Sequence, residues 1–284
     1  MINPLEDKYW VPRGNNKLLT YLGPPLKSNL DKKKLKRFLA ERSAFGAIWY
    51  YDDNYTDQGP WYRTACDQSD YDIDLIKSKS FRRKIRKCLK YCQIRLMDLS
   101  EMLDSIYDVY LQASKRYKNL DLISKDEFKT DLSNKLKTHD LKAFGVFCEE
   151  NLIAYMIVMD FNDCAMGYLA AFDPGYSKHY PMYGLCYFVA KYFVSDRGYK
   201  EFNRGTRPLL HETNIDEFLI SLGYRKKYCR LGIFFVSHID FTISALNRLS
   251  PVLKYLVPKK FRLVIEALIQ AKRIAHQTMK SKVE

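Results

Sequence analysis

Two histidines and one glutamate stand where a proton could be exchanged. His179 lies in a turn-like Tyr-Ser-Lys-His-Tyr-Pro stretch, whereas His211 and Glu212 lie in a predicted loop. Imidazole titrates near neutral pH, so either histidine could accept a proton from an attacking amine. A lone loop histidine is often simply exposed, and the sequence leaves both interpretations open.

A second polar group follows a short predicted strand. Asn203, Arg204, Gly205 and Thr206 are consecutive. Together they offer amide, guanidinium and hydroxyl groups to a polar ligand. The alternative is an ordinary turn that leads toward the next helix.

The elements that must position these groups run from residue 141 to residue 236. Apolar and aromatic runs predict three strands, and Glu150–Asn151 joins the first two as a hairpin. Asp173, Pro174 and Gly175 end the third strand. Helical spacing of apolar residues then predicts a long helix that Gly198 ends. The predicted order is strands 141–149, 151–161 and 164–172, helix 183–197, strand 200–203, helix 215–222 and strand 228–236.

Four segments in this order resemble those of GNAT acyltransferases, most closely the Fem-type (FemAB-like) and polysaccharide-locus acetyltransferase branch. They are residues 72–90 (DIDLIKSKSFRRKIRKCLK), 107–117 (YDVYLQASKRY), 173–185 (DPGYSKHYPMYGL) and 198–223 (GYKEFNRGTRPLLHETNIDEFLISLG). The resemblance implies an α/β (α+β) fold with a mixed, mostly antiparallel central sheet flanked by helices, and a C-terminal helical extension beyond it. It also implies a splay between strands 164–172 and 200–203.

The resemblance implies a chemistry that depends mainly on positioning. In GNAT-like enzymes an amine attacks an acyl thioester in a slot of the sheet, a backbone N–H stabilises the oxyanion, and an acid protonates the thiolate. With 22 tyrosines in the chain, any single one could equally serve packing. The implied catalytic residues are Tyr168, Tyr180, His211 and Glu212. The implied donor-binding residues are Tyr176, Lys178, Gly184, Asn203, Arg204, Gly205 and Thr206.

The chain departs from its relatives in two places. The acetyl-CoA signature of this fold uses backbone amides at a helix N-terminus, but here Pro181 lacks an N–H and only Gly184 is small. Simple acetyl-CoA binding is therefore not favoured, and the Tyr-x-Lys-x-x-Pro form of residues 176–181 is similar to the Fem-like branch instead.

The second departure concerns a tRNA donor. Aminoacyl-tRNA users of the Fem type carry a Phe-Lys pair where this chain has Phe218 and Leu219. The lost cation weakens the case for tRNA, although Arg225, Lys226 and Lys227 could supply charge from another direction.

Composition and cysteine content favour a cytoplasmic enzyme. The chain has 284 residues, 47% of them hydrophobic, and no apolar run long enough for a bilayer. Seven cysteines without a disulfide-like spacing fit a reducing compartment. Cys88 and Cys92 lie four apart, but no second pair with histidines stands at a zinc-finger spacing. We therefore expect no metal site and no tightly bound cofactor.

The formal charge of +14 is concentrated in two regions. Residues 77–95 contain nine basic residues and no acid, which could attract a phosphate-bearing donor, tRNA or lipid, or could form a solvated helix face. Residues 241–284 contain nine basic and two acidic residues. Their predicted amphipathic helix could lie on an anionic membrane or pack within the protein.

These observations predict three domains: an N-terminal extension over 1–70, readable as a reduced acyltransferase copy, a GNAT-like domain over 71–236 and a basic helical tail over 237–284. The leading hypothesis is an N-acyltransferase or aminoacyltransferase that uses acyl-CoA, acyl-carrier protein or aminoacyl-tRNA to modify an amine of a cell-envelope or polysaccharide precursor. A variant directs this chemistry to a lipid head group at the inner face of the membrane. The alternative is a non-catalytic GNAT-fold protein that binds nucleic acid or anionic lipid.

Overall fold

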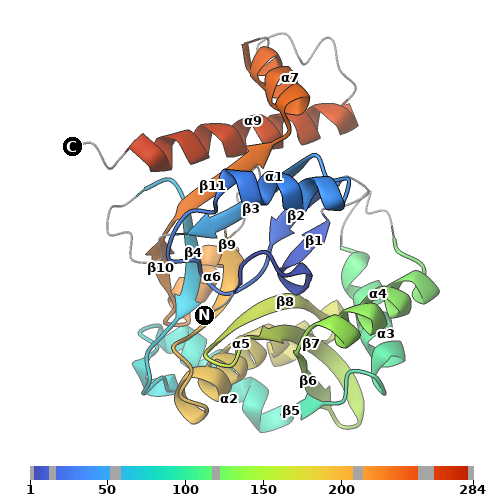
Figure 1. Cartoon of the computed structure of the whole chain (residues 1–284). Coiled ribbons are helices and arrows are strands. Elements are labelled where there is room, and N and C mark those ends of the chain that lie inside the picture. The colour runs from blue at the N-terminus through green and yellow to red at the C-terminus, as the bar shows by residue number, and fades with distance from the viewer. Residues whose placement is uncertain are drawn as a thin grey trace. The chain divides into compact units, whose positions relative to one another are not determined.

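A computed structural model describes residues 3–12, 17–51, 59–116, 122–206, 214–248 and 259–280 (Figure 1). The chain divides into two compact units that are discontinuous in sequence. Unit 1 comprises residues 1–63, 206–213 and 226–284, and unit 2 comprises residues 64–205 and 214–225. The domain boundaries at residues 70 and 236 stay a prediction, and each unit is best understood by itself.

Unit 2 is built on a mixed sheet with the strand order β10-β4-β9-β8-β7-β6-β5. Strands β5 to β8 pair antiparallel, whereas β8 and β9 pair parallel. The predicted mostly antiparallel sheet is thus confirmed. The strands are β4 (Tyr62–Cys66), β5 (Gln93–Met97), β6 (Leu141–Cys148), β7 (Asn151–Asp160), β8 (Cys164–Phe172), β9 (Glu201–Thr206) and β10 (Arg225–Tyr228). Residues of β4, β9 and β10 belong to both units.

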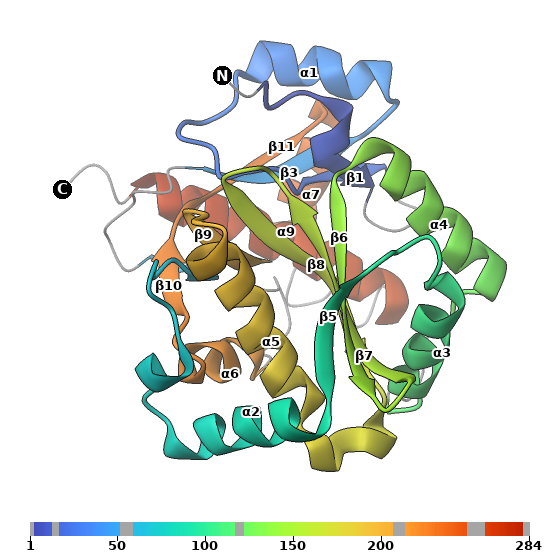
Figure 2. The same ribbon diagram turned by 90° about the horizontal axis from the view of Figure 1, so that it is seen from below.

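Helices cover both faces of strands β5 to β8. Figure 2 shows α2 (Lys79–Tyr91) and α5 (Pro181–Lys191) on one side and α3 (Leu103–Ser114) and α4 (Lys125–Thr138) on the other. A separate hydrophobic cluster fills each side, because the strands alternate apolar side chains between both faces. The remaining helical pieces of unit 2 are η2 (Ile73–Leu75), η3 (Pro174–His179), the π-helical turn η4 (Tyr192–Asp196) and α6 (Ile215–Ser221).

Strand β8 separates from β9 after a short ladder. Their pairing covers three residue pairs and ends at Met166 opposite Asn203. Directly beyond, β8 carries one extra residue, because Ile157 of β7 lies opposite Leu169 while Val158 lies opposite Gly167. Tyr168 is therefore a β-bulge, a feature common beside active sites. The two predicted strands are neighbours in one sheet and diverge at this point.

The bulge is visible in the way β8 buries its side chains. Ala165 packs in the cluster beside α5, and so do Ala170 and Phe172. Leu169 packs in the opposite cluster, beside α3. Ala165 and Ala170 are an odd number of residues apart, which an unbroken strand with a period of two would place on opposite faces.

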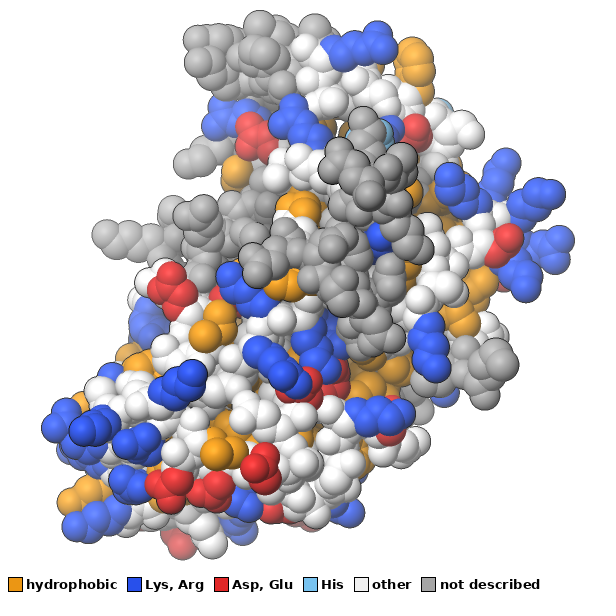
Figure 3. Space-filling model, turned by 90° about the vertical axis from the view of Figure 1, so that its left-hand side faces the viewer, with side chains coloured by type: hydrophobic (Ala, Val, Ile, Leu, Met, Phe, Trp, Pro, Cys, Tyr) orange, Lys and Arg blue, Asp and Glu red, His pale blue; other side chains and the backbone are white. Residues whose placement is uncertain are grey.

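Helix α2 forms because its apolar and basic residues separate at helical spacing. The Ser78 side chain caps the helix by accepting a hydrogen bond from Phe81 N at 3.3 Å. Ile85 and Cys88 are fully buried, so the basic residues point outward. Figure 3 shows basic side chains gathered at the lower left of the visible face, in the part of unit 2 formed by α2.

Unit 1 contains a second sheet with the order β1-β2-β3-β11. The predicted closing strand 228–236 becomes β11, which pairs antiparallel with β3 and so lies in this sheet and not beside the strands of the predicted GNAT core. The elements are η1 (Asp7–Tyr9), β1 (Trp10–Pro12), β2 (Leu18–Tyr21), α1 (Lys32–Glu41), β3 (Gly46–Tyr51), β11 (Arg230–Phe235), α7 (Ser237–Arg248) and α9 (Lys259–Lys280).

Helix α9 packs against β11 through one face. Ile269, Ala271, Ile274 and Ala275 are buried, and Thr278 accepts a hydrogen bond from Leu231 N of β11 at 3.4 Å. Intramolecular packing therefore accounts for much of the amphipathic pattern of the tail. Within the described ranges, none of the helices combines the length and apolarity that a bilayer span requires.

This packing predicts unequal effects of two matched truncations in α9. Ile274→Ala should lower the free energy of unfolding by about 2 kcal/mol or more, since Ile274 is 6% exposed and its removal leaves a cavity. Leu263→Ala removes the same number of carbon atoms at a position that is 43% exposed, and should change stability by less than about 0.5 kcal/mol. Urea denaturation followed by circular dichroism measures both, and equal losses would contradict packing of α9 on β11.

Candidate functional site

The turn between β8 and α5 is held by local hydrogen bonds. The Asp173 carboxylate accepts from Gly175 N at 2.8 Å, and Tyr180 N donates to Ser177 O at 3.0 Å. Tyr180 itself has φ 55° and ψ 46°, a left-handed conformation that costs a non-glycine residue about 1–2 kcal/mol. Pro181 follows as the first residue of α5. A bulky tyrosine at this strained position points to a function for its side chain.

The N-terminus of α5 does not present the usual open row of amides. Pro181 has no N–H, and the amides of Tyr183 and Gly184 both donate to the carbonyl oxygen of Tyr180, at 3.0 and 3.4 Å. Anion binding at a helix start depends on N–H groups that are free to face the ligand. A phosphate at this end of α5 would therefore depend on side chains for most of its charge compensation.

Those side chains come from α2, which packs against α5. Arg83, Lys84, Lys87 and Tyr180 line a cavity of about 280 Å³. Lys84 Nζ donates to the Tyr183 hydroxyl at 2.9 Å, and Lys87 Nζ lies 5.4 Å from the centre of the Tyr180 ring. Over the part of the chain that the structure describes, no carboxylate forms an ion pair with these three cations. We call this cavity the basic pocket, and its charge suits a phosphate group.

The other central cations of α2 are engaged within the protein. Arg82 donates to Ile76 O at 2.6 Å, and Arg86 forms an exposed ion pair with Asp74 at 3.0 Å. The basic run of the sequence is thus divided by the fold into residues that tie down the preceding segment and residues that face the basic pocket.

Two donor-binding residues predicted from the sequence lie differently. Lys178 is exposed on η3 and does not line the basic pocket. Gly184 is buried, and a Cβ atom there would collide with Sγ of Cys88 on α2. The glycine therefore allows α2 and α5 to approach closely. This packing role accounts for a glycine at position 184 without any contact to an acyl donor.

Strand β9 places its polar residues at the divergence from β8. Asn203 is buried, donates to Glu201 Oε1 at 2.9 Å and accepts from Gly205 N at 2.9 Å, where φ is 80°. These bonds give Asn203 a structural role in shaping the turn. Arg204 Nη1 donates to Gly167 O at 3.3 Å and so spans the opening between the strands. The backbone of Thr206 ends β9, and its side chain lies outside the described residues.

The two predicted catalytic residues that the structure describes, Tyr168 and Tyr180, have different surroundings. Tyr168 is half-buried and packs in the cluster beside α3 and α4, with Lys135 Nζ 5.6 Å from its ring centre. Tyr180 lines the basic pocket, and the predicted donor-binding residue Tyr176 packs in the α5 cluster. His211 and Glu212 lie outside the described residues, so their catalytic role stays a prediction.

The residues weighed for a tRNA donor have structural partners. Leu219 is buried in the core, and Phe218 stacks edge-on against Tyr183 with ring centres 5.0 Å apart. Arg225 forms an ion pair with Asp67 at 2.6 Å. Arg225 is thus already engaged and is a weak substitute for the lysine that Fem-type proteins carry here.

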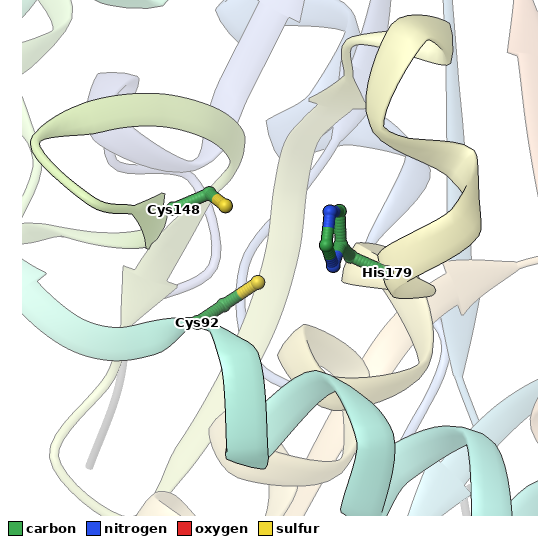
Figure 4. Close-up of side chains that lie close together, drawn as sticks. All are labelled: Cys92, Cys148 and His179. Atoms are coloured by element: carbon green, nitrogen blue, oxygen red, sulfur yellow. The ribbon is translucent and has the colours of Figure 1, made fainter.

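One cluster was missed by the sequence analysis. Cys92 follows α2, Cys148 ends β6 and His179 ends η3, yet one ligand atom from each lies within 4.8 Å of the other two. Figure 4 shows both thiols pointing toward the imidazole. Burial raises the pKa of the Cys92 thiol to about 11, so this thiol stays protonated near neutral pH and is a poor nucleophile. The three residues are separated by 56 and 31 positions in the chain, so they form no short sequence motif for metal binding.

The strain at Tyr180 leads to a test. Tyr180→Gly should change the free energy of unfolding by less than about 1 kcal/mol, because relief of the left-handed backbone offsets the lost contacts with Lys84 and Lys87. The same change should weaken binding of a phosphate-bearing donor. Urea denaturation and calorimetric titration with coenzyme A measure the two quantities. A large loss of stability would show instead that the ring is needed for folding.

Comparison with known proteins adds to this geometry. Residues 77–208 match the family model described as acetyltransferase (GNAT) domain. The C-terminal domain of a protein assigned as a lysylphosphatidylglycerol synthetase, from Agrobacterium fabrum, superposes with a TM-score of 0.53 at 12% identity and covers 86% of this chain and 84% of its own. FemX superposes with a TM-score of 0.56 at 9% identity, over 82% of this chain and 85% of its own. No curated protein matches the chain by sequence.

These findings agree with the strand order, the divergence of β8 from β9 and the helix that follows them. The predicted resemblance to the fold of Fem-type proteins is confirmed. Residues 77–208 match an acetyltransferase (GNAT) domain, and this match together with the shared fold indicates an acyltransferase enzyme.

Proposed function

We propose that this acyltransferase takes an acyl or aminoacyl group from a phosphate-bearing donor and passes it to an amine of a cell-envelope or polysaccharide precursor. The observation that carries the proposal is the basic pocket beside Tyr180, at the start of the helix that follows the diverging strand. In this proposal Arg83, Lys84 and Lys87 replace the amides that α5 does not offer.

The reaction needs few side chains. The amine nitrogen forms a bond to the acyl carbon, and the bond from that carbon to sulfur in a thioester, or to oxygen in an aminoacyl ester, breaks. The amine loses a proton, and the leaving group gains one. The bulge at Tyr168 interrupts the regular ladder of β8, which favours a backbone N–H available to the oxyanion. Arg204, at the opening, is placed to contact a polar part of the donor.

The acceptor is proposed by analogy with the structural neighbours. One is named for the joining of lysine to phosphatidylglycerol, and the other is FemX. The first of these names favours an aminoacyl group as cargo and an envelope lipid as acceptor. The predicted position at the inner face of the membrane belongs to this proposal and rests on the same analogy.

Donor binding should depend on the pocket cations and not on net charge alone. The double variant Arg83→Ala/Lys87→Ala should weaken coenzyme A by about 100-fold or more, since each charge-assisted hydrogen bond contributes about 1.5–3 kcal/mol. The affinity of this variant for coenzyme A should also change less with salt concentration than that of the unaltered protein. Isothermal titration calorimetry at several salt concentrations measures both, with bulk tRNA as a parallel ligand that shows which donor the pocket prefers.

Lys79→Ala is the matched control, because Lys79 is exposed on the same helix and lies outside the basic pocket. It removes one charge of the same kind and should change coenzyme A or tRNA affinity by less than about threefold, the size of a screened surface effect. If the single variant Lys87→Ala weakened neither ligand more than Lys79→Ala, the basic pocket would not be the donor site. Native mass spectrometry of freshly purified protein would then name any donor retained elsewhere.

A further inference from the structure

We propose that Cys92, Cys148 and His179 form a binding site for a zinc ion. The site does not depend on the proposed acyl transfer, and its residues come from three elements: the end of α2, the end of β6 and the end of η3. Two thiolates and one imidazole are a donor set that selects a soft or borderline ion over calcium or magnesium.

The distances fit such an ion after small side-chain rotations. Zinc to sulfur and zinc to nitrogen bonds of about 2.3 and 2.0 Å place tetrahedral ligand atoms about 3.5–3.8 Å apart. The three ligand atoms lie within 4.8 Å of one another. A contraction of about 1 Å or less would complete the site. The fourth position of the tetrahedron stays open to water, as three protein ligands leave it in many zinc sites.

A second observation is the state of His179. Its Nδ1 atom is buried and has no hydrogen-bond partner within the described part of the chain. A buried polar atom without a partner costs free energy, so such an atom calls for an explanation. An ion among the two sulfurs and the ring would satisfy the imidazole. The neighbouring Tyr91 and Tyr176 rings, 6.0 and 6.3 Å from the imidazole centre, limit its freedom to turn away.

The charge of the occupied site also suits its surroundings. Two thiolates with one zinc ion carry no net charge, so the site can form beside a basic helix without adding to its repulsion. A third cysteine, Cys88, packs on Gly184 and lies outside the cluster. The donor set is therefore two cysteines and one histidine.

The position gives the ion a mechanical role. His179 directly precedes Tyr180, the strained residue of the basic pocket. A zinc ion would fix the turn η3 to α2 and β6, and would hold the tyrosine beside Arg83 and Lys87. We infer that the ion stabilises the turn and leaves the chemistry of transfer to other groups.

The test uses the full chain, reduced and stripped of metal by a chelator. Addition of Co²⁺ should give thiolate charge-transfer bands and the visible bands of a tetrahedral ion, saturating at one ion per chain, and Zn²⁺ should displace it. Cys92→Ser, Cys148→Ser and His179→Gln should each weaken Zn²⁺ binding by at least about 100-fold. Removal of a residue that only hydrogen-bonds to a metal ligand usually weakens binding by about 10–100-fold, so a direct ligand should cost more. Zn²⁺ should raise the thermal unfolding midpoint of the unaltered protein and not that of His179→Gln.

Cys164→Ala is the control, since Cys164 is a buried cysteine outside the cluster and its loss should leave the affinity for Zn²⁺ within about twofold. If the cysteine variants fail to fold, the cobalt spectrum of the unaltered protein and the zinc affinity of His179→Gln still test the proposal, because His179 is only half-buried. Absence of thiolate bands at one equivalent of Co²⁺ would overturn the proposal. So would metal affinity that all three variants retain, or a disulfide between Cys92 and Cys148 in a protein that binds no ion when reduced.

Discussion

The close approach of α2 to α5 is the contact on which the site depends. It is possible because Gly184 leaves room for the Cys88 side chain, where any larger residue would push the helices apart. Close packing of this kind fixes the relative position of two helices to within a fraction of a side chain. The same contact carries Arg83 and Lys87 to the start of α5 and brings Cys92 to within reach of His179.

Helix α2 beside the basic pocket therefore combines two opposite demands. Buried apolar residues on one face of α2 stabilise its packing on the core. The basic residues on its outer face repel one another, and this repulsion does not stabilise the fold. Arg86 forms an ion pair with Asp74, and Arg82 donates a hydrogen bond to a backbone carbonyl, and both interactions offset part of this repulsion. The pocket cations have no such acid partner in the described structure. Charge held without compensation in a cavity is more readily explained by a ligand than by stability.

Local patterns in the sequence predicted local structure well. The turn near Glu150 joins β6 and β7, the apolar spacing from residue 183 becomes α5, and the basic segment 77–95 contains helix α2. Helix α4 was not predicted, because only Phe128 and Leu132 of its residues are buried and its apolar pattern is weak. The partner of β11 was not predicted either, since strand pairing across about 180 residues leaves no trace in the periodicity of either strand. The cluster of Cys92, Cys148 and His179 was not predicted for the same reason, since its members are far apart in the sequence.

The extra residue in β8 has a consequence for how related sequences can change. Loss of the bulged residue would restore a period of two, so that Leu169 would still face α3 and Ala170 would still face α5. One further residue inserted after the bulge would instead turn over the last four side chains. The cores on both sides would then receive side chains of the wrong size. In relatives that keep these cores, insertions within β8 should therefore be rarer than loss of the bulged residue.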